Sequence, residues 1–138
     1  MEYCCYIIYN YNCSYVGITN NPINRIKRHN QEMSGGAKYT KMIGPGWKYI
    51  CQIHGFKNKI HALQFEWAVK HMGKYKKGIE NRILNLFKIL NKHYWTKKSP
   101  ESLNYNLKVI WNDITFIPEN YTLPNYIDMD IIDSYNLQ

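Results

Sequence analysis

Two apolar segments predict a β-hairpin: Tyr3-Cys4-Cys5-Tyr6-Ile7-Ile8-Tyr9 and Ser14-Tyr15-Val16-Gly17-Ile18. The first segment alternates aromatic and aliphatic character, which favours a strand. Asn10-Tyr11-Asn12, between the two segments, has the polar composition of a turn. We therefore expect two antiparallel strands, with Tyr6 and Tyr15 side by side on them.

A helical pattern follows the hairpin. Thr19-Asn20-Asn21-Pro22 is typical of a helix start, because a polar cap precedes a proline in the first turn. This helix is expected to run to about Met33 and to stop before Gly35-Gly36. Further on we expect a strand over 47–54, helices over 58–72 and 79–92, and a short strand or extended segment over 105–111. The predicted fold class is α+β, a small antiparallel sheet of about three strands flanked by helices.

Positive charge is concentrated in the first part of the sequence. All 18 Lys and Arg lie at or before Lys108 together with five acids, so residues 1–108 carry a net charge of +13 (18 minus 5). The other five acids give residues 109–138 a charge of −5. A body this basic predicts binding to a polyanion such as nucleic acid, with an affinity that falls as salt rises. Charge that serves only solubility is the alternative.

The lengths of the apolar runs and the spacing of the cysteines argue against a membrane span and against a cysteine metal site. The sequence has no run of about 18 apolar residues, so no membrane span is expected. Met1-Glu2-Tyr3-Cys4 shows no basic region ahead of an apolar core, and we therefore expect an intracellular protein. The cysteines form no Cys-x-x-Cys pair, which favours reduced core residues over a metal site. They are Cys4, Cys5, Cys13 and Cys51.

Five polar residues in the first half supply groups suited to cutting a phosphodiester: Tyr6, Tyr15, Arg25, His29 and Glu66. Arg25 and His29 stand four residues apart, so a helix places both on one face. Glu66 has apolar helical neighbours, and a carboxylate there is costly unless it is paired or bound to a metal. We expect it to bind Mg²⁺, which commonly takes one or two protein carboxylates plus phosphate and water. A salt bridge to a core arginine is the alternative.

The other members of this set suggest roles in the same reaction. The guanidinium of Arg25 suits a phosphate and the negative charge on a pentacoordinate phosphorus. Its alternative is a solvated basic face shared with neighbouring cations. His29 is expected to hold a tyrosine hydroxyl or a phosphate oxygen. A phenol has a pKa of about 10 and is a poor base at neutral pH unless nearby cations lower that value; we expect Arg25, a lysine and Mg²⁺ to do so.

This set resembles the GIY-YIG endonuclease superfamily. Cys4-Cys5-Tyr6 and Tyr15-Val16-Gly17 stand at its two half-motifs. Residues 25–30, 35–40, 54–56 and 62–68 follow in an order similar to the Slx branch, the catalytic subunits of eukaryotic structure-selective DNA endonucleases. The similarity covers about residues 3–72 and extends more weakly through 83–90 and 103–111.

The resemblance implies a Mg²⁺-dependent endonuclease, with Mn²⁺ able to substitute. The implied substrate is branched DNA, such as flaps or four-way junctions, in recombination, repair or replication. Tyr6 takes the place of the family's favoured general base, and Tyr15 would orient the water or the scissile phosphate. The implied location is the nucleus, or the cytoplasm of a virus-infected or bacterial cell.

One part of the Slx pattern is missing. Slx proteins carry a zinc-binding RING-type domain that docks a scaffold subunit, and this sequence has no cysteine after Cys51. No zinc-mediated docking is therefore expected. A homodimer or a different contact with a scaffold protein stays open.

A second set of residues is expected to contact the DNA backbone: Lys27, Arg28, Gly35, Gly36, Lys38, Lys41 and Lys59. The segment 35–40 is interpreted as a loop that brings backbone N–H groups and Lys38 against DNA. A plain glycine turn is the alternative. The remaining histidines share no metal-ligand spacing and are interpreted as structural. They are His54, His61, His71 and His93.

We predict a nuclease domain over residues 1–111, including a C-terminal helical extension, and an acidic tail over 112–138 packed on that body. A loosely ordered tail is the alternative. One rival function is a sequence-specific homing or restriction nuclease, but 112–138 are too few and too acidic for an added DNA-reading domain. The other rival is a catalytically inactive DNA-binding subunit, against which the complete set of five residues argues.

Overall fold

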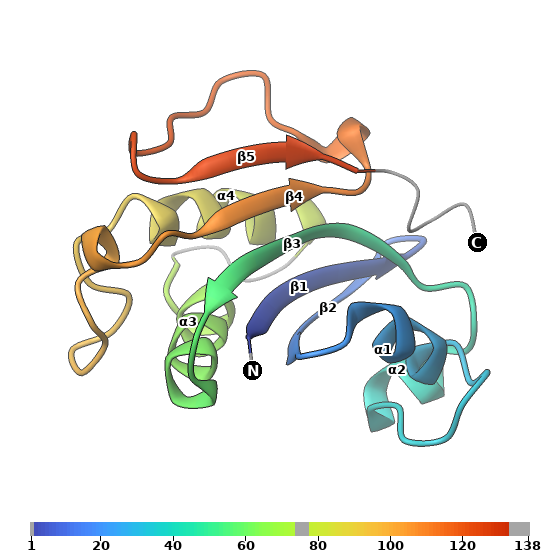
Figure 1. The fold of residues 1–138 in the computed structure, drawn as a ribbon. Coiled ribbons are helices and arrows are strands. Elements are labelled where there is room, and N and C mark those ends of the chain that lie inside the picture. Colours follow the sequence, from blue (N-terminus) through green and yellow to red (C-terminus); the bar gives the residue numbers. More distant parts are fainter. Residues whose placement is uncertain (1, 74–77, 133–138) are drawn as a thin grey trace.

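A mixed sheet organises residues 2–73 and 78–132, the part of the chain that the computed structural model describes (Figure 1). Among these residues the sheet has five strands in the order β2-β1-β3-β4-β5. Every neighbouring pair is antiparallel except β4 and β5. Along the chain the strands and α-helices are β1 (Tyr3–Asn10), β2 (Cys13–Thr19), α1 (Pro22–His29), α2 (Lys38–Ile43), β3 (Lys48–Phe56), α3 (Lys59–His71), α4 (Ile79–Leu90), β4 (Lys108–Trp111) and β5 (Asp128–Ile131). The predicted α+β class is confirmed.

The predicted hairpin is formed by β1 and β2. In its register Tyr6 lies opposite Gly17, and Ile8 lies opposite Tyr15. Tyr6 and Tyr15 are therefore diagonal neighbours on one face, with ring centroids 6.4 Å apart. β2 is one of the two edge strands of the sheet, so one side of it has no neighbouring strand among the described residues.

Helices cover both faces of the sheet. α1 and α2 lie on the face where Tyr6, Ile8, Trp47 and Tyr49 form a small buried cluster (Figure 1). α3 and α4 pack on the opposite face. The larger apolar core lies there, and it includes Ile7, Cys51, Phe65, Leu86 and Trp111. This division follows from the alternation of side chains along a strand, which sends Tyr6 to one face and Ile7 to the other.

The first helix and the glycine segment differ from their predictions. α1 ends at His29 rather than near Met33, because Gln31 adopts a left-handed conformation with a φ of 64° that a helix does not tolerate. The segment 35–40 is only partly a loop, since α2 begins at Lys38. Within α2 the Thr40 side chain is buried, and the buried Trp47, which follows the helix, donates to Thr40 O at 3.1 Å. This tertiary packing stabilises a helix only six residues long.

The sheet extends beyond the predicted three strands. β4 is the short strand expected as one option over 105–111, and β5 comes from the acidic segment that follows. β5 runs parallel to β4, and Asp130 lies 3.4 Å from the Nζ of Lys108. Ile127 is buried in the larger core. The domain boundary at residue 111 stays a prediction, and residues 133–138 of the predicted tail lie outside the described residues. No helix in the described part is long and apolar enough to span a bilayer.

Candidate active site

Tyr6 is the centre of the site. Its side chain is fully buried, and its hydroxyl oxygen lies 3.1 Å from Arg25 Nε and 2.7 Å from His29 Nε2. Both partners lie on α1, which begins at Pro22 and is capped by the Asn21 side chain. The prediction that Arg25 and His29 share one helix face is confirmed. Three of the five predicted residues are thus in direct contact.

The hydrogen-bond directions in this cluster follow from Thr40. Its hydroxyl donates to the carbonyl of Ala37 at 3.0 Å, so its oxygen accepts from His29 Nδ1 at 2.8 Å. His29 therefore carries its proton on Nδ1, and Nε2 accepts the hydroxyl hydrogen of Tyr6. Arg25 Nε donates to the same hydroxyl oxygen. The Tyr6 proton is aimed at an imidazole nitrogen that can accept it.

Burial sets the protonation states of this cluster. It raises the pKa of Tyr6 well above the ordinary value, and the hydrogen bond and charge of Arg25 offset only part of that rise. Arg25 therefore lowers the pKa of Tyr6 as expected, but among the protein's own groups burial outweighs this effect and the net shift is upward. Burial, followed by the charge of Arg25, lowers the pKa of His29 to about 4. His29 is accordingly neutral at pH 7.

Gly17 leaves the room that the Tyr6 hydroxyl occupies. A Cβ atom at Gly17 would lie 2.4 Å from that oxygen and 2.7 Å from the ring carbon that bears it. Any side chain at this position must therefore displace the hydroxyl from Arg25 and His29. The glycine of the second half-motif is required by this close approach.

Tyr15 joins the cluster through its ring. The centroid of that ring is 5.1 Å from the His29 ring, and the Tyr39 ring stacks on it at 6.4 Å with a 17° interplanar angle. The Nζ of Lys70, from α3, lies 5.5 Å from the centroid of the Tyr15 ring. Tyr15 thus lies between the α1 residues and a cation supplied from the other face of the sheet.

Glu66 comes to the site from α3. Its side chain is 17% exposed, and Lys70 Nζ lies 3.8 Å from its carboxylate, one helical turn away. Burial raises the pKa of Glu66, and Lys70 lowers it by less. No arginine lies within 4.0 Å of this carboxylate among the described residues, so the alternative of a core arginine pair is wrong. Glu66 and Tyr15 are connected through their shared neighbour, Lys70.

The donor set is compatible with a magnesium ion. No group of three or more His, Cys, Asp or Glu residues that could hold a metal occurs among the described residues. Mg²⁺ does not need such a group, because it keeps several waters and is often bound through one carboxylate plus substrate phosphate. Glu66 is half-buried and its cationic partner is at the long distance of 3.8 Å, so its oxygens retain coordination capacity.

The carbonyl groups of Ser34 and Gly35 accept hydrogen bonds from two arginines of α1. Arg25 Nη1 donates to Gly35 O at 3.0 Å, and Arg28 Nη1 donates to Ser34 O at 2.5 Å. A Cβ atom at Gly36 would lie 2.5 Å from the carbonyl oxygen of Arg28, so this close approach requires glycine. The segment therefore orients the guanidinium of Arg25. A role of its N–H groups in DNA contact stays a prediction.

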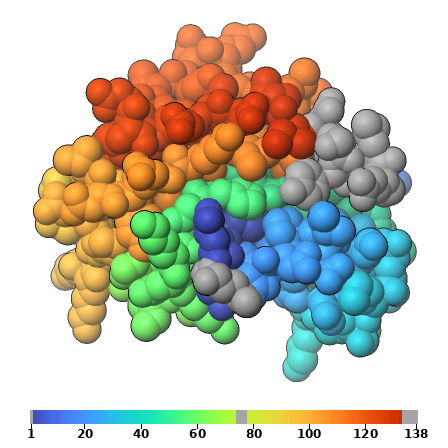
Figure 2. All heavy atoms as spheres, viewed as in Figure 1, coloured from blue at the N-terminus to red at the C-terminus, as the bar shows by residue number. Residues whose placement is uncertain are grey.

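The predicted DNA contacts lie around this cluster. Lys27, Lys38, Lys41 and Lys59 are exposed. Figure 2 shows the start of β1 between the surfaces of α1 and α3, seen from one side. Near it a hollow of about 420 Å³ is lined by Tyr3, Ile18, Thr19, Asn20, Asn21, Asn24, Arg25, Arg28 and Lys59. The DNA-binding role of all seven predicted residues stays a prediction.

Two residues that contact the site, Lys70 and Thr40, were not among the predicted site residues. Lys70 is four residues after Glu66, and that spacing is a signal that the two side chains meet on a helix. Thr40 has no comparable signal, because its link to His29 depends on how α2 packs against α1.

The other histidines and the cysteines have structural contacts. Each remaining histidine bonds or pairs with a nearby group: His54 with Gln52, His61 with Tyr105, His71 with Trp67 O, and His93 with Glu101. The four cysteines are free thiols. Cys4, Cys5 and Cys51 are buried in the sheet.

Known proteins are similar to this chain in sequence. The model of the GIY-YIG catalytic domain matches residues 2–82. The structure-specific endonuclease subunit slx1 of Schizosaccharomyces japonicus is 45% identical over 75 residues, which are 51% of this chain and 27% of that protein. The homolog from Drosophila mojavensis is 58% identical over 55 residues, or 39% of this chain and 18% of that protein. The subunit from Schizosaccharomyces pombe is 40% identical over 76 residues, or 51% and 28%.

The matched segments therefore span between 18% and 28% of the length of these relatives. The family model, in contrast, matches more than half of this chain and includes the whole cluster around Tyr6 as well as Glu66. The chain belongs to the GIY-YIG family of nuclease catalytic domains.

Proposed function

We propose that this protein is a metal-dependent, structure-selective endonuclease that hydrolyses phosphodiester bonds in branched DNA. One observation carries the proposal: the Tyr6 hydroxyl is held between the Arg25 guanidinium and the neutral Nε2 of His29. That arrangement provides a proton acceptor and a positive charge at one point, as hydrolysis of a phosphodiester requires.

The proton of the attacking water leaves through Tyr6 and His29. The hydroxyl oxygen of Tyr6 takes a proton from water while its own proton passes to His29 Nε2, 2.7 Å away. This transfer needs no free phenolate, whose formation burial disfavours. Thr40 keeps the other ring nitrogen protonated, so Nε2 remains the acceptor. Thr40 is thus a positioning residue for the reaction.

Arg25 stabilises the negative charge that develops on the phosphoryl oxygens. Its Nε bonds Tyr6 and one Nη bonds Gly35 O, which fixes the plane of the guanidinium. Glu66 would hold a Mg²⁺ or Mn²⁺ ion, which when bound supplies Lewis-acid stabilisation of the phosphate. The leaving 3′-oxygen takes its proton from solvent.

Branched DNA is the proposed substrate class, in recombination, repair or replication. The relatives are described as structure-specific endonuclease subunits, which supports selection by DNA shape. The net charge of +13 over residues 1–108 (18 cations minus 5 acids) supports binding to the phosphate backbone. We further propose an intracellular site of action. The word subunit in the relatives' names motivates a search for a protein partner or a homodimer.

The test is cleavage of labelled duplex, flap and four-way junction DNA of one sequence, with Mg²⁺, Mn²⁺ or EDTA. We expect metal-dependent cuts near the branch in the flap and junction, and little cutting of plain duplex. Tyr6→Phe is the control, because it removes only the hydroxyl and should fold yet be nearly inactive. Cutting at one sequence irrespective of branching would instead support a homing or restriction nuclease. DNA binding without any cutting would support an inactive subunit.

A further inference from the structure

Arg82 is a half-buried cation without an anionic partner in the described residues. It lies in the first turn of α4, and no carboxylate there comes within 4.0 Å of its guanidinium. Its Nη1 donates to Ser14 Oγ at 3.3 Å, a long bond to a neutral acceptor. Burial lowers the pKa of Arg82, and the nearby Tyr39 opposes this only in part. Burial has removed water from this guanidinium, and one long hydrogen bond to a neutral hydroxyl replaces little of that hydration. Such a cation is suited to bind an external anion.

Arg82 reaches the sheet beside the reaction centre. Its partner Ser14 precedes Tyr15 on β2, an edge strand. Lys70 of α3 lies over the Tyr15 ring. α3 and α4, the helices on the face of the larger core, therefore each place one cation beside the unpaired edge of β2, next to Tyr15.

The predicted DNA-binding cations lie at the other end of the same strand. Arg28 and Lys59 line the hollow that Thr19 also borders. Ser14 and Thr19 are five residue steps apart, or about 17 Å at the rise of a strand. That distance equals the rise along the helix axis of about five nucleotides of a B-form strand, at 3.4 Å per nucleotide. Cations thus border β2 at both ends, and Tyr15 follows Ser14 on the strand between them.

We propose that Arg82 binds a backbone phosphate of the cleaved strand, on the opposite side of the scissile phosphate from Arg28 and Lys59. This inference rests on the proposed nuclease function. The strand follows the edge of β2, and Lys70 adds positive charge along the same path. A planar guanidinium can donate two parallel hydrogen bonds to a phosphate, so Arg82 also fixes the register of the strand.

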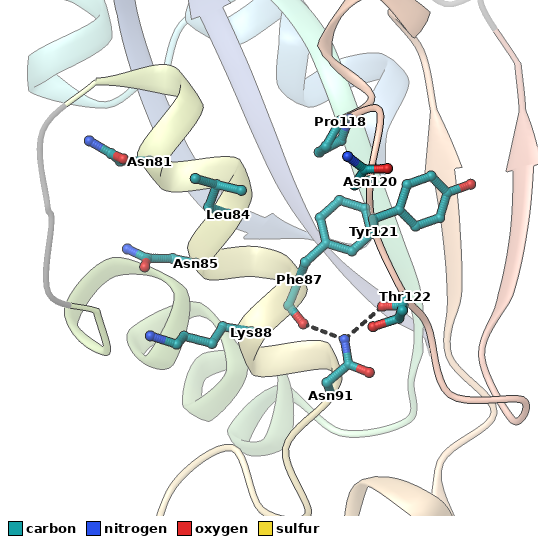
Figure 3. A pocket seen from close by; sticks show the side chains of 10 residues that line it. All are labelled: Asn81, Leu84, Asn85, Phe87, Lys88, Asn91, Pro118, Asn120, Tyr121 and Thr122. Carbon is teal, nitrogen blue, oxygen red and sulfur yellow. Dashed lines mark hydrogen bonds between the residues drawn. The ribbon is translucent and has the colours of Figure 1, made fainter.

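Lys88 is the matched control for Arg82. It lies on the same helix and is exposed, but it borders a separate hollow formed by α4 and residues 118–122 (Figure 3). There Asn91 Nδ2 donates to Phe87 O and Thr122 O, both at 2.8 Å. This hollow does not include any residue of β2. Removing the charge of Lys88 therefore tests the general effect of one cation on DNA affinity.

The first measurement is the dissociation constant for a flap DNA at several salt concentrations. Glu66→Gln protein is used as the parent so that the DNA stays uncut. Adding Arg82→Ala should weaken binding about tenfold and reduce the slope of log affinity against log salt by about 0.9, the value for one phosphate contact. Arg82→Lys should fall in between, and Lys88→Ala should change the constant less than twofold. Thermal denaturation of each variant verifies that it is folded.

The second measurement locates the phosphate. Single methylphosphonates, which are uncharged, replace successive phosphates on both sides of the cut. Parent protein should lose affinity at each contacted position. Arg82→Ala should become insensitive at one position on one side, and Arg28→Ala at a position on the other side. An unchanged sensitivity profile in Arg82→Ala, or an affinity equal to that of Lys88→Ala, would overturn the subsite.

Cleavage by the wild-type chain separates the two claims. If it cuts flap DNA and Arg82→Ala keeps the parent's phosphate profile, the subsite alone is wrong. If the wild type cuts none of the DNA structures, the proposed function itself is wrong.

Discussion

The two faces of the sheet are built in different ways. On the face of α1 and α2, buried polar groups are hydrogen-bonded: Tyr49 Oη donates to Pro22 O at 2.7 Å, and Trp47 Nε1 donates to Thr40 O at 3.1 Å. On the face of α3 and α4 the core is aliphatic and aromatic. Among the described residues, the buried side-chain polar atoms without a partner are Gln64 Oε1, Trp95 Nε1 and Trp111 Nε1, which lie on α3 or in the larger core.

The two faces therefore contribute differently: one mainly stabilises the fold, and the other mainly fixes the positions of the site residues. A large apolar core stabilises through the area it removes from water, and this gain outweighs the about 1–3 kcal/mol that an unbonded buried indole costs. The smaller face has to hold Tyr6, Arg25 and His29 to within a few tenths of an ångström, and hydrogen bonds provide that direction. We therefore expect substitutions on the two faces to change different quantities.

The largest effect on cleavage is expected from Glu66→Gln. Glu66, on α3, is the proposed metal ligand, and the change removes the charge that would hold the metal while keeping side-chain volume. Cleavage should fall below detection. The melting temperature should be unchanged or higher, because a half-buried carboxylate is removed.

Glu80→Gln on α4 is the control for this variant, since Glu80 is exposed and outside the site. Turnover that persists in Glu66→Gln would place the metal elsewhere.

Arg25→Ala should lower the cleavage rate by on the order of 10²-fold, the usual loss for one charge-stabilising donor at a reacting centre. Lys27→Ala, on the same helix but exposed, should weaken DNA binding only modestly. Single-turnover rates at saturating protein separate the two effects. If both variants lost rate equally, Arg25 would act as an ordinary surface cation.

Thr40→Val should lower the rate about tenfold, less than the roughly 10²–10⁴-fold attributed to a positioned acid or base, because Thr40 acts only through His29. The substitution keeps the shape of the side chain but removes the oxygen that accepts from His29 Nδ1. Thr40→Ser should restore most of the rate, because the hydroxyl returns. A Thr40→Val protein that matched Thr40→Ser in rate would show that the tautomer of His29 is set without Thr40.

The same cluster predicts how stability depends on pH. The pKa of His29 is lowered to about 4 in the fold, so between its ordinary value of 6.5 and about 4 the unfolded chain takes up a proton that the folded chain does not. The free energy of unfolding should therefore fall as the pH is lowered through this window. Urea unfolding at pH 7 and pH 5 measures the change, and His29→Gln should make it smaller. Equal slopes in both proteins would mean that other groups cause it.

The smallest effect on cleavage is expected from Ile127→Ala. This side chain packs into the larger core ahead of β5, so its truncation should cost about 2–5 kcal/mol of unfolding free energy. The rate per folded molecule should stay the same. Ile131→Ala is the control, because Ile131 is 51% exposed on β5. Loss of rate in folded Ile127→Ala would show that the two faces are not independent.

The sequence predicted the elements whose signal is local. Alternation around Tyr6 and Tyr15 predicted the hairpin, and the four-residue spacing of Arg25 and His29 predicted their shared face. The end of α1 was wrong because it depends on the conformation of Gln31, a residue type with no strong turn preference. β5 was missed because its pairing depends on the distant β4 and its sequence, Asp-Met-Asp-Ile, is short and charged.

The candidate site was predictable in composition and only partly in mechanism. The five residues stand at recognisable positions, and the direct contact of Tyr6, Arg25 and His29 agrees with that choice. The direction of the proposed proton path depends on Thr40, and the rise in the pKa of Tyr6 depends on burial. Both are properties of packing between segments far apart in sequence, which spacing alone does not encode.

The parallel pairing of β5 with β4 has a consequence for folding during synthesis. Antiparallel neighbours join through short turns, whereas β5 follows β4 only after residues 112–127 have crossed the apolar face. A ribosome adds residues one at a time from the amino end, so β4 leaves the ribosome before β5 and can pair with β3 before β5 reaches it. Until it arrives, the outer edge of β4 offers unpaired backbone groups to other chains. Aggregation of newly made protein should therefore rise when residues 112–131 are slow to emerge from the ribosome.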